Sequence, residues 1–333
     1  MPFLTKSLRG HLKALSLLIG GLGNLGFSSE SLAEILSIKE VADGVYVHQG
    51  SHHLPNPQNH GEIANIGFIV GNRCVAVIDT GGSQEQGQRL KAAVKATTET
   101  PICYVINTHV HPDHLYGNRA FKSKGVEFVG HYRLANAMAM RAPYYLSQAK
   151  DQLGLTLNPE DFVPPDIEVR DTLDLDLGGR TLHLTAQPTA HTDNDLTILD
   201  LKSETLWLGD LLFMGHLPVI DGSLLGWLKI IDQLPSITAK RVIPGHGPIT
   251  ALWPLALAGE KRYLDSLAHD IRAAQKANKT IEQAMDEIGL EHRADWQLFD
   301  DFHRRNIASA FAELEWEDPS PEPPIQNPGR SNP

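Results

Sequence analysis

The stretch Thr108-His109-Val110-His111-Pro112-Asp113-His114 carries three imidazoles and one carboxylate within a few positions. It follows the apolar run 102–107, whose composition is typical of a buried strand. The stretch therefore stands where a strand ends, which is where open α/β sheets place their sites. The first two histidines can share one side of the loop, while the Asp-His pair that follows can face a second point. Zinc favours imidazole and carboxylate ligands on rigid backbone, so we expect a metal site here. Because the ligands face two points, we expect two metals.

This stretch resembles the metal-binding signature of the metallo-β-lactamase superfamily, and three later stretches fit the same pattern in the expected order. Each of them follows or ends an apolar run, which predicts a strand end. They are Pro188-Thr189-Ala190-His191-Thr192, Trp207-Leu208-Gly209-Asp210-Leu211 and Ile243-Pro244-Gly245-His246-Gly247. The resemblance covers about residues 41–250. It implies an α/β fold, the αβ/βα four-layer sandwich, and two β-rich halves flanked by helical patterns agree with it.

The resemblance also implies a role for each candidate ligand. One metal would be held by three histidines, a second by one aspartate and two histidines, and a further aspartate would bridge them: His109, His111 and His191; Asp113, His114 and His246; Asp210. A hydroxide between two zinc ions would attack an ester, thioester, amide or similar bond. Asp113 would steer that hydroxide or relay its proton. Asp79 would support the histidine-rich loop without binding metal.

His216 follows the bridging position on the same segment and is surplus to a two-metal site. One interpretation makes it a catalytic residue at the pocket mouth, where its imidazole stabilises a developing oxyanion. The other makes it a partly exposed loop histidine, since histidine often has intermediate burial. We predict the catalytic role.

Ligand details separate the branches of the superfamily. Metallo-β-lactamases lack the bridging aspartate, and many carry a cysteine in its place, so Asp210 favours the broader hydrolases over dedicated lactamases. Di-iron redox members replace one histidine of the motif with glutamate, so the histidine at position 111 disfavours them. Two alternatives stay open: an iron-dependent persulfide dioxygenase, and a non-catalytic metal-stabilised partner of a periplasmic redox system. Residues 65–71, 105–118 and 209–216 resemble SoxH-like periplasmic zinc metallohydrolases of quinoprotein relay systems. We therefore expect two Zn²⁺ in preference to iron, and association with a quinoprotein dehydrogenase.

Composition sets limits on the partners. The chain has 333 residues, of which 41% are hydrophobic and 21% charged, as in soluble globular proteins. A formal net charge of −11, without any basic run, argues against a nucleic-acid partner. The expected partner of the site is a small-molecule substrate.

The chain's two ends have compositions of their own. Residues 1–33 resemble a secretory signal peptide, with Lys6, Arg9 and Lys13 before a short apolar run and Ser31-Leu32-Ala33 as cleavage site. An uncleaved anchor or amphipathic helix is the alternative. We expect a periplasmic protein that begins near Glu34 and has no stable membrane insertion. Residues 318–333 contain six prolines and predict a disordered tail.

Between these ends we expect a metallo-β-lactamase-like domain at 34–250 and a helical extension at 251–317. The extension has helical but no strand patterns, and it could pack against the domain, cover one edge of the site or make a dimer contact.

Cys74 and Cys103 are the two cysteines of the chain, and each opens an apolar run. The superfamily places these runs side by side, and an oxidising compartment would permit a disulfide. Pairing straight across neighbouring strands is geometrically demanding, so a disulfide stays possible without being the favoured expectation. Neither cysteine is placed to bind a metal or to act as a nucleophile.

Overall fold

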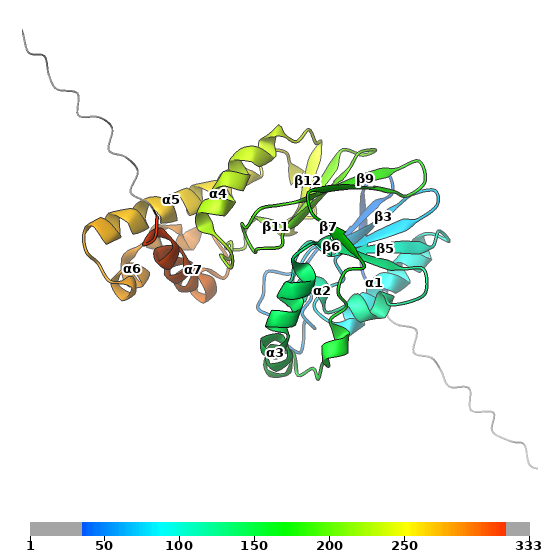
Figure 1. The fold of residues 1–333 in the computed structure, drawn as a ribbon, viewed down its shortest axis with the longest axis horizontal. Coiled ribbons are helices and arrows are strands. Elements are labelled where there is room, and N and C mark those ends of the chain that lie inside the picture. The colour runs from blue at the N-terminus through cyan, green and yellow to red at the C-terminus, as the bar shows by residue number, and fades with distance from the viewer. Residues whose placement is uncertain (1–34, 318–333) are drawn as a thin grey trace, which may run out of the picture. The chain divides into compact units, whose positions relative to one another are not determined.

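Two mixed sheets stacked on one another, with helices on their outer faces, form the body of the protein (Figure 1). The computed structural model describes residues 35–317. This arrangement is the αβ/βα sandwich that the sequence predicted. The expected signal peptide and the expected proline-rich tail lie outside the described residues, so both stay predictions.

The first sheet has seven strands in chain order. Its first four strands form an antiparallel meander, and the last four run parallel. Parallel neighbours need a crossover, which helix α1 supplies between β4 and β5. The strands are β1 (Lys39–Ala42), β2 (Val45–His48), β3 (Ile66–Val70), β4 (Val75–Ile78), β5 (Ile102–Ile106), β6 (Glu127–His131) and β7 (Ile167–Val169).

The second sheet has six strands in the order β13-β12-β11-β10-β9-β8. All neighbours are antiparallel except β11 and β12, which run parallel and are joined through α4. Gly178 and Gly179 form the turn between β8 and β9, and both have positive φ. The strands are β8 (Thr172–Asp176), β9 (Thr181–Ala186), β10 (Leu196–Asp200), β11 (Thr205–Phe213), β12 (Arg241–His246) and β13 (Ala251–Leu252).

Apolar side chains of both sheets meet between them in one core. Val47 and Ile78 contribute from the first sheet, and Leu184 and Trp207 from the second, all of them buried. β2 alternates buried and half-buried positions, as a strand with one covered face does. β4 and β11 are buried along their whole length, because helices cover their outer side.

The helices flank these sheets and have ordinary caps. Ser83 and Ser223 cap α1 and α4, each accepting a hydrogen bond from a backbone N–H of the first turn. The α-helices are α1 (Gln84–Thr97), α2 (Pro112–Leu115), α3 (Leu134–Leu153), α4 (Leu224–Gln233), α5 (Leu257–Lys276), α6 (Ile281–Glu287) and α7 (Phe299–Leu314). Short 3₁₀ segments are η1 (Asn118–Phe121), η2 (Pro159–Asp161), η3 (Leu234–Ser236) and η4 (Leu290–Ala294).

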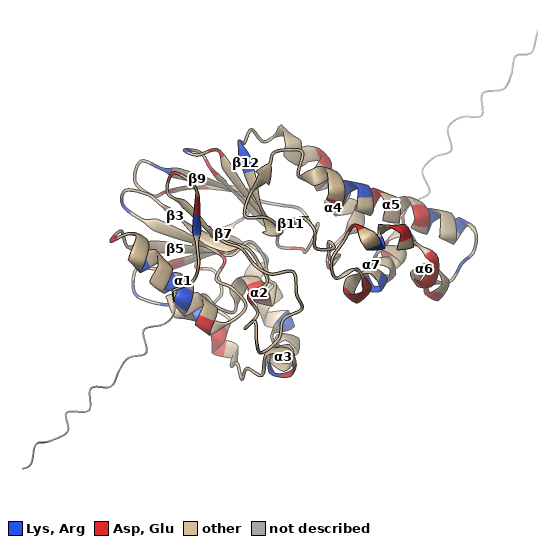
Figure 2. Cartoon of the chain, turned by 180° about the vertical axis from the view of Figure 1, so that it is seen from behind, with Lys and Arg blue, Asp and Glu red and all other residues tan. Residues whose placement is uncertain are grey.

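The residues after β13 form the helical extension, α5 to α7. Tyr263, Leu267 and Ile307 share one apolar cluster with Leu212 of β11 and Trp227 of α4, so the extension packs against the second sheet. Acidic and basic residues are interspersed along its helices (Figure 2). Among the described residues, no helix combines the length and apolar character needed to cross a bilayer.

Cys74 and Cys103 form a disulfide between the start of β4 and β5. The structure therefore has the pairing that the sequence left open. The register of β4 on β5 shifts between Val75 and Ala76. This irregularity accompanies a Cα–Cα distance of 5.5 Å between the cysteines, within the range for a disulfide. The apolar pattern does not reveal a register shift of this kind.

Candidate active site

The seven predicted metal ligands converge at one cleft, to which both sheets contribute. Five of them line the cleft, and His109 and His114 are fully buried next to these. Four come from the loop after β5 and from α2, one from the loop between β9 and β10, one from β11 and one from the end of β12: His109, His111, Asp113, His114, His191, Asp210 and His246. Most of them follow or end a strand, as the sequence predicted. The sandwich therefore places the site along the edge where its two sheets meet.

The first ligand group consists of three ring nitrogens that face a common point. His111 Nδ1 lies 3.0 Å from His109 Nε2 and 2.9 Å from His191 Nε2. Ligands of a tetrahedral zinc ion with Zn–N bonds of about 2.0–2.1 Å lie roughly 3.3 Å apart, so these separations fit one ion. Asp210 Oδ2 approaches the same group, 3.7 Å from His109 Nε2 and 3.5 Å from His191 Nε2.

The second group lies directly beside the first and shares that aspartate. Asp113 Oδ2 is 3.2 Å from His246 Nε2 and 3.6 Å from His114 Nε2. Asp210 Oδ1 lies 3.1 Å from His114 Nε2, and its Oδ2 lies 3.3 Å from His246 Nε2. Asp210 thus faces both groups, which is the position expected of a bridging carboxylate.

Each ligand histidine is held from behind through its other ring nitrogen. Such contacts fix the tautomer and the ring orientation before any ion binds. The holding atoms are Thr108 Oγ1 for His109 at 3.0 Å, Asp221 Oδ2 for His111 at 3.1 Å, Asp79 Oδ2 for His114 at 2.8 Å, the Val219 carbonyl for His191 at 2.7 Å and the Ile63 carbonyl for His246 at 2.9 Å.

Asp79 has the supporting position that the sequence predicted. Its Oδ1 accepts a hydrogen bond from the Thr108 N–H and its Oδ2 accepts one from the Thr108 hydroxyl, both at 2.8 Å. The same Oδ2 contacts His114. Asp79 itself has φ 55°, a left-handed conformation that aspartate and asparagine tolerate better than most residues. One carboxylate therefore fixes both the start and the end of the histidine-rich loop.

The electrostatics and the unpaired atoms of this cluster fit divalent cations. Burial opposes protonation of His246, but Asp210 and Asp113 raise its pKa to about 9, and Asp210 likewise holds the pKa of buried His114 well above its usual value. His114 Nε2 and Asp210 Oδ1 are buried and face each other, yet neither has a hydrogen bond within residues 35–317. Inward-facing imidazole and carboxylate atoms that stabilise positive charge are the donors expected of a two-metal site.

Asp221, in the loop before α4, is a supporting residue that the sequence did not reveal. Its Oδ2 accepts from His111 and from Arg141 of α3, and its Oδ1 accepts from Arg305 of α7. Burial opposes ionisation, but the contact with His111 and the charge of Arg305 hold the pKa of Asp221 well below its usual value. A lone aspartate in a loop has no pattern that would distinguish it from a solvated turn residue.

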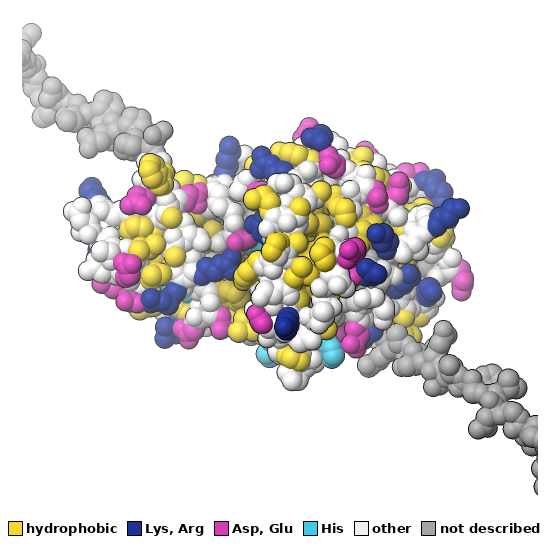
Figure 3. Space-filling view, turned by 60° about the horizontal axis from the view of Figure 1, so that its bottom comes forward, with side chains coloured by type: hydrophobic (Ala, Val, Ile, Leu, Met, Phe, Trp, Pro, Cys, Tyr) yellow, Lys and Arg dark blue, Asp and Glu magenta, His cyan; other side chains and the backbone are white. Residues whose placement is uncertain are grey.

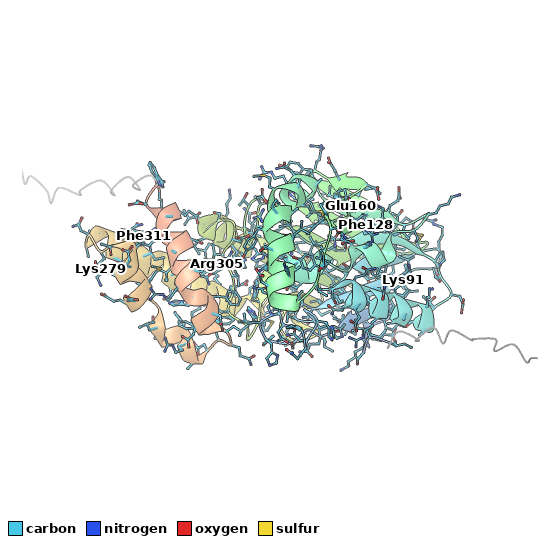
Figure 4. All side chains as sticks on the ribbon, turned by 90° about the horizontal axis from the view of Figure 1, so that it is seen from below. Lys91, Phe128, Glu160, Lys279, Arg305 and Phe311 are labelled. Atoms are coloured by element: carbon cyan, nitrogen blue, oxygen red, sulfur yellow. A yellow bond between two sulfur atoms is a disulfide. The ribbon has the colours of Figure 1, made fainter. Side chains whose placement is uncertain are left out.

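The cleft has a volume of about 530 Å³ and two contrasting surfaces. We call the seven ligands the metal floor. Several side chains of α3 and α7 also line the cleft, and we call five of them the helical wall: Arg141, Tyr144, Tyr145, Phe302 and Arg305. The extension therefore covers one edge of the site as well as packing against the second sheet. Figure 4 shows Arg305 on the side of α7 that faces α3.

His216 lies where floor and wall meet. Its ring centroid is 4.9 Å from that of His246 and 5.5 Å from that of Phe302. Its Nδ1 donates to the Leu217 carbonyl at 2.7 Å, which leaves a lone pair on Nε2. Burial and the neighbouring His246 lower the pKa of His216 to about 3, so the neutral ring accepts hydrogen bonds through Nε2. His216 thus lies in the pocket, as the sequence predicted. In this tautomer Nε2 has a lone pair and no proton, so stabilising an oxyanion would require the Nε2-protonated form of the ring; the oxyanion role stays a prediction.

Two glycines leave room for the bridging carboxylate. A Cβ on Gly245 would lie 1.9 Å from Asp210 Oδ1, and one on Gly209 would lie 2.7 Å from the Cβ of Thr108. Gly209 also has φ 52°. Any side chain at position 245 would therefore displace Asp210 from the two ligand groups.

Comparison with known proteins identifies the family of the chain. The family model of the metallo-beta-lactamase superfamily matches residues 61–246, more than half of the chain. The chain belongs to the metallo-beta-lactamase superfamily. This is a superfamily of metal-dependent hydrolases, which agrees with the enzyme class expected from the ligand set. α5 to α7, and with them Phe302 and Arg305, lie beyond the matched residues.

Individual relatives are distant. A linear primary-alkylsulfatase from Pseudomonas sp. (strain ATCC 19151) is 24% identical over 211 residues, which are 51% of this chain and 39% of that protein. The chain thus aligns with well under half the length of this curated relative.

Solved structures show the same fold at low identity. A metallo-beta-lactamase from Pontibacter korlensis has a TM-score of 0.57 at 21% identity, over 69% of this chain and 99% of its own. A double mutant of the sec-alkyl sulfatase PisA1 has a TM-score of 0.57 at 17% identity, over 76% of this chain and 45% of its own. These likenesses confirm the predicted fold of this superfamily member.

Proposed function

We propose that the protein is a dinuclear zinc hydrolase that cleaves an ester, thioester, amide or similar bond of a small molecule. The observation that carries the proposal is the pair of ligand groups that share Asp210, which faces ring nitrogens of both groups at 3.1–3.7 Å. Imidazole and carboxylate donors at tetrahedral separations favour zinc over magnesium or calcium.

Two zinc ions bound there would supply a Lewis acid and lower the pKa of a bound water. The chain's own residues supply the geometry. Asp113 lies at the open side of the floor, where its carboxylate can orient a water or hold a proton during attack, while Asp79 and Asp221 keep His114 and His111 in their ligating tautomers.

Sulfate esters belong among the candidate bonds. The curated relative is an alkylsulfatase by name, and the cleft has aromatic and aliphatic side chains beside the metal floor that would accept an apolar chain. A substrate panel therefore needs both sulfate esters and carboxylic esters.

We also propose that the mature protein is periplasmic and works with a quinoprotein dehydrogenase. The leader composition of residues 1–33 and the Cys74–Cys103 disulfide support export to an oxidising compartment. The partner rests on the resemblance of residues 65–71, 105–118 and 209–216 to SoxH-like proteins. N-terminal sequencing of exported protein should start near Glu34, and a sequence starting at Met1 would refute cleavage.

Elemental analysis of protein extracted from the periplasm, followed by a panel of carboxylic ester, thioester, amide and alkyl sulfate substrates, tests the activity. We expect about two zinc ions per chain and turnover of at least one class. A single iron with persulfide oxidation would replace the proposal by the dioxygenase alternative. Full zinc loading without turnover of any class would favour a non-catalytic partner.

A further inference from the structure

Two guanidinium groups of the helical wall meet on one carboxylate. Arg141 Nη2 lies 3.1 Å from Asp221 Oδ2, and Arg305 Nη2 lies 2.7 Å from Asp221 Oδ1. Within residues 35–317, Asp221 is the hydrogen-bond partner of both side chains. A guanidinium has five N–H donors, so most donors of both arginines stay available to the cleft.

The charge of the cleft contrasts with that of the whole chain. Its lining has two guanidiniums against three carboxylates, those of Asp113, Asp210 and Asp221. Two divalent ions with neutral imidazoles would turn this single excess negative charge into three excess positive charges. The chain as a whole carries −11, so the loaded cleft would be a positive site in a negative protein. Such a field attracts anions and repels cations.

Apolar side chains surround these arginines. Tyr144 and Tyr145 of α3 and Phe302 of α7 line the cleft, and Leu54 lines it from the loop after β2. Met140, one turn before Tyr144 on α3, is 74% exposed and Tyr144 is 65% exposed. Figure 3 shows hydrophobic side chains gathered over the α3 region. A substrate with an apolar body would bury this surface.

The arginines are separate from the metal floor. The ring of His111 and the carboxylate of Asp221 stand between the metal-facing Nδ1 and the two guanidiniums. We therefore assign an anionic group held by Arg141 and Arg305 to a part of the substrate other than the bond under attack.

We propose that the substrate carries, apart from the bond that is cleaved, a second anionic group that Arg141 and Arg305 bind, with an apolar body between the two. A carboxylate or a sulfonate has enough oxygens to accept from both planar guanidiniums. This inference rests on the hydrolase function proposed above. α7, which carries Arg305, lies beyond the residues that the family model matches.

A matched pair of esters tests the proposal. The 4-nitrophenyl monoester of adipic acid and 4-nitrophenyl hexanoate share chain length and leaving group, and they differ in the distal carboxylate. We expect wild type to prefer the adipate ester, and Arg305→Ala to lower the ratio of the two kcat/KM values roughly tenfold to a hundredfold, mainly through the KM of the adipate ester.

Two further variants separate recognition from support of the fold. Arg304→Ala removes a neighbouring cation of α7 that pairs with Asp286 away from the cleft, and it should leave the ratio unchanged. Arg305→Lys keeps the charge without the planar fork and should restore part of the ratio. Equal losses for both esters in Arg305→Ala would mean that the arginine only holds Asp221 and His111, which overturns the proposal.

Calorimetry with adipate keeps this test independent of turnover. We expect adipate to bind wild type and to bind Arg305→Ala at least about tenfold more weakly. If neither ester is cleaved while adipate binding depends on Arg305, the hydrolase proposal fails and the anion site stands. If the esters are cleaved but both proteins bind adipate equally, or wild type does not bind it, the anion site is refuted and the hydrolase stands.

Discussion

The metal floor and the helical wall face the same cleft but are built in opposite ways. In the floor, His109, His114 and His191 are at most 1% exposed, and each ring is tied from behind to a fixed atom. In the wall, Tyr144 is largely exposed and Arg305 reaches across from another helix to a shared carboxylate. In the proposed function the floor would carry the chemistry, and the wall would select which molecule reaches the floor.

The largest effect should come from removing the bridge. In Asp210→Ala both ligand groups lose their shared carboxylate, and two cations there would repel each other with less negative charge between them. We expect fewer than two metal ions per chain and a loss of at least about a thousandfold in turnover, since metal-assisted attack contributes several kcal/mol. Elemental analysis and kinetics measure both, and full loading with normal turnover would refute the bridging role.

Substitution of His216, which lies between the metal floor and the helical wall, tests whether this side chain takes part in catalysis. His216→Ala should leave the metal content unchanged and reduce turnover on the order of a hundredfold if the imidazole contacts the reacting group. His216→Gln, which keeps a hydrogen-bonding atom, should recover part of this loss. Unchanged kinetics would place His216 among the structural residues, and loss of one metal would mean that the ligand assignment is wrong.

Asp79→Asn tests whether the floor depends on atoms that touch no metal. Asparagine tolerates the left-handed backbone but cannot accept from the Thr108 N–H, the Thr108 hydroxyl and His114 as a carboxylate does. We expect metal affinity to fall roughly tenfold to a hundredfold in chelator competition. Asp174→Asn is the matched control, because it breaks an exposed carboxylate–histidine pair with His183 away from the cleft.

The smallest effect is expected in the wall. Phe302→Ala removes an aromatic side chain next to His216 without touching a ligand. We expect the KM of apolar substrates to rise by about tenfold or less, with kcat and metal content little changed, because this contact is equally present before and during reaction. A larger fall in kcat than rise in KM would show that α7 also positions the floor.

The same contrast explains how much the sequence revealed. The predicted ligand set rested on the resemblance of short stretches at strand ends to the superfamily's signature, where His109 to His114, Asp210 and His246 stand out by type and context. The sandwich followed from the same stretches. The structure brings the seven side chains together in the two groups that the resemblance implied.

The sequence did not reveal the helical wall, and the reason is physical. Arg141 and Arg305 lie on helices far apart in the sequence, and a lone arginine on a helix is indistinguishable from one on a solvated face. Asp221 gains its role only when three other side chains reach it. The disulfide likewise depended on a local register shift that the apolar pattern does not encode.

Gly245 decides which part of this cleft can change over time. With a Cβ only 1.9 Å from Asp210 Oδ1, a saturation library at this position should contain a single active member. Positions of the helical wall with solvent on one side, such as Tyr144, which is 65% exposed, have room for a change of side chain that Gly245 lacks. Mutant libraries that aim at a new substrate should therefore target these positions. Those on α7 lie outside the residues that the family model matches, and substitutions there leave the metal floor unchanged.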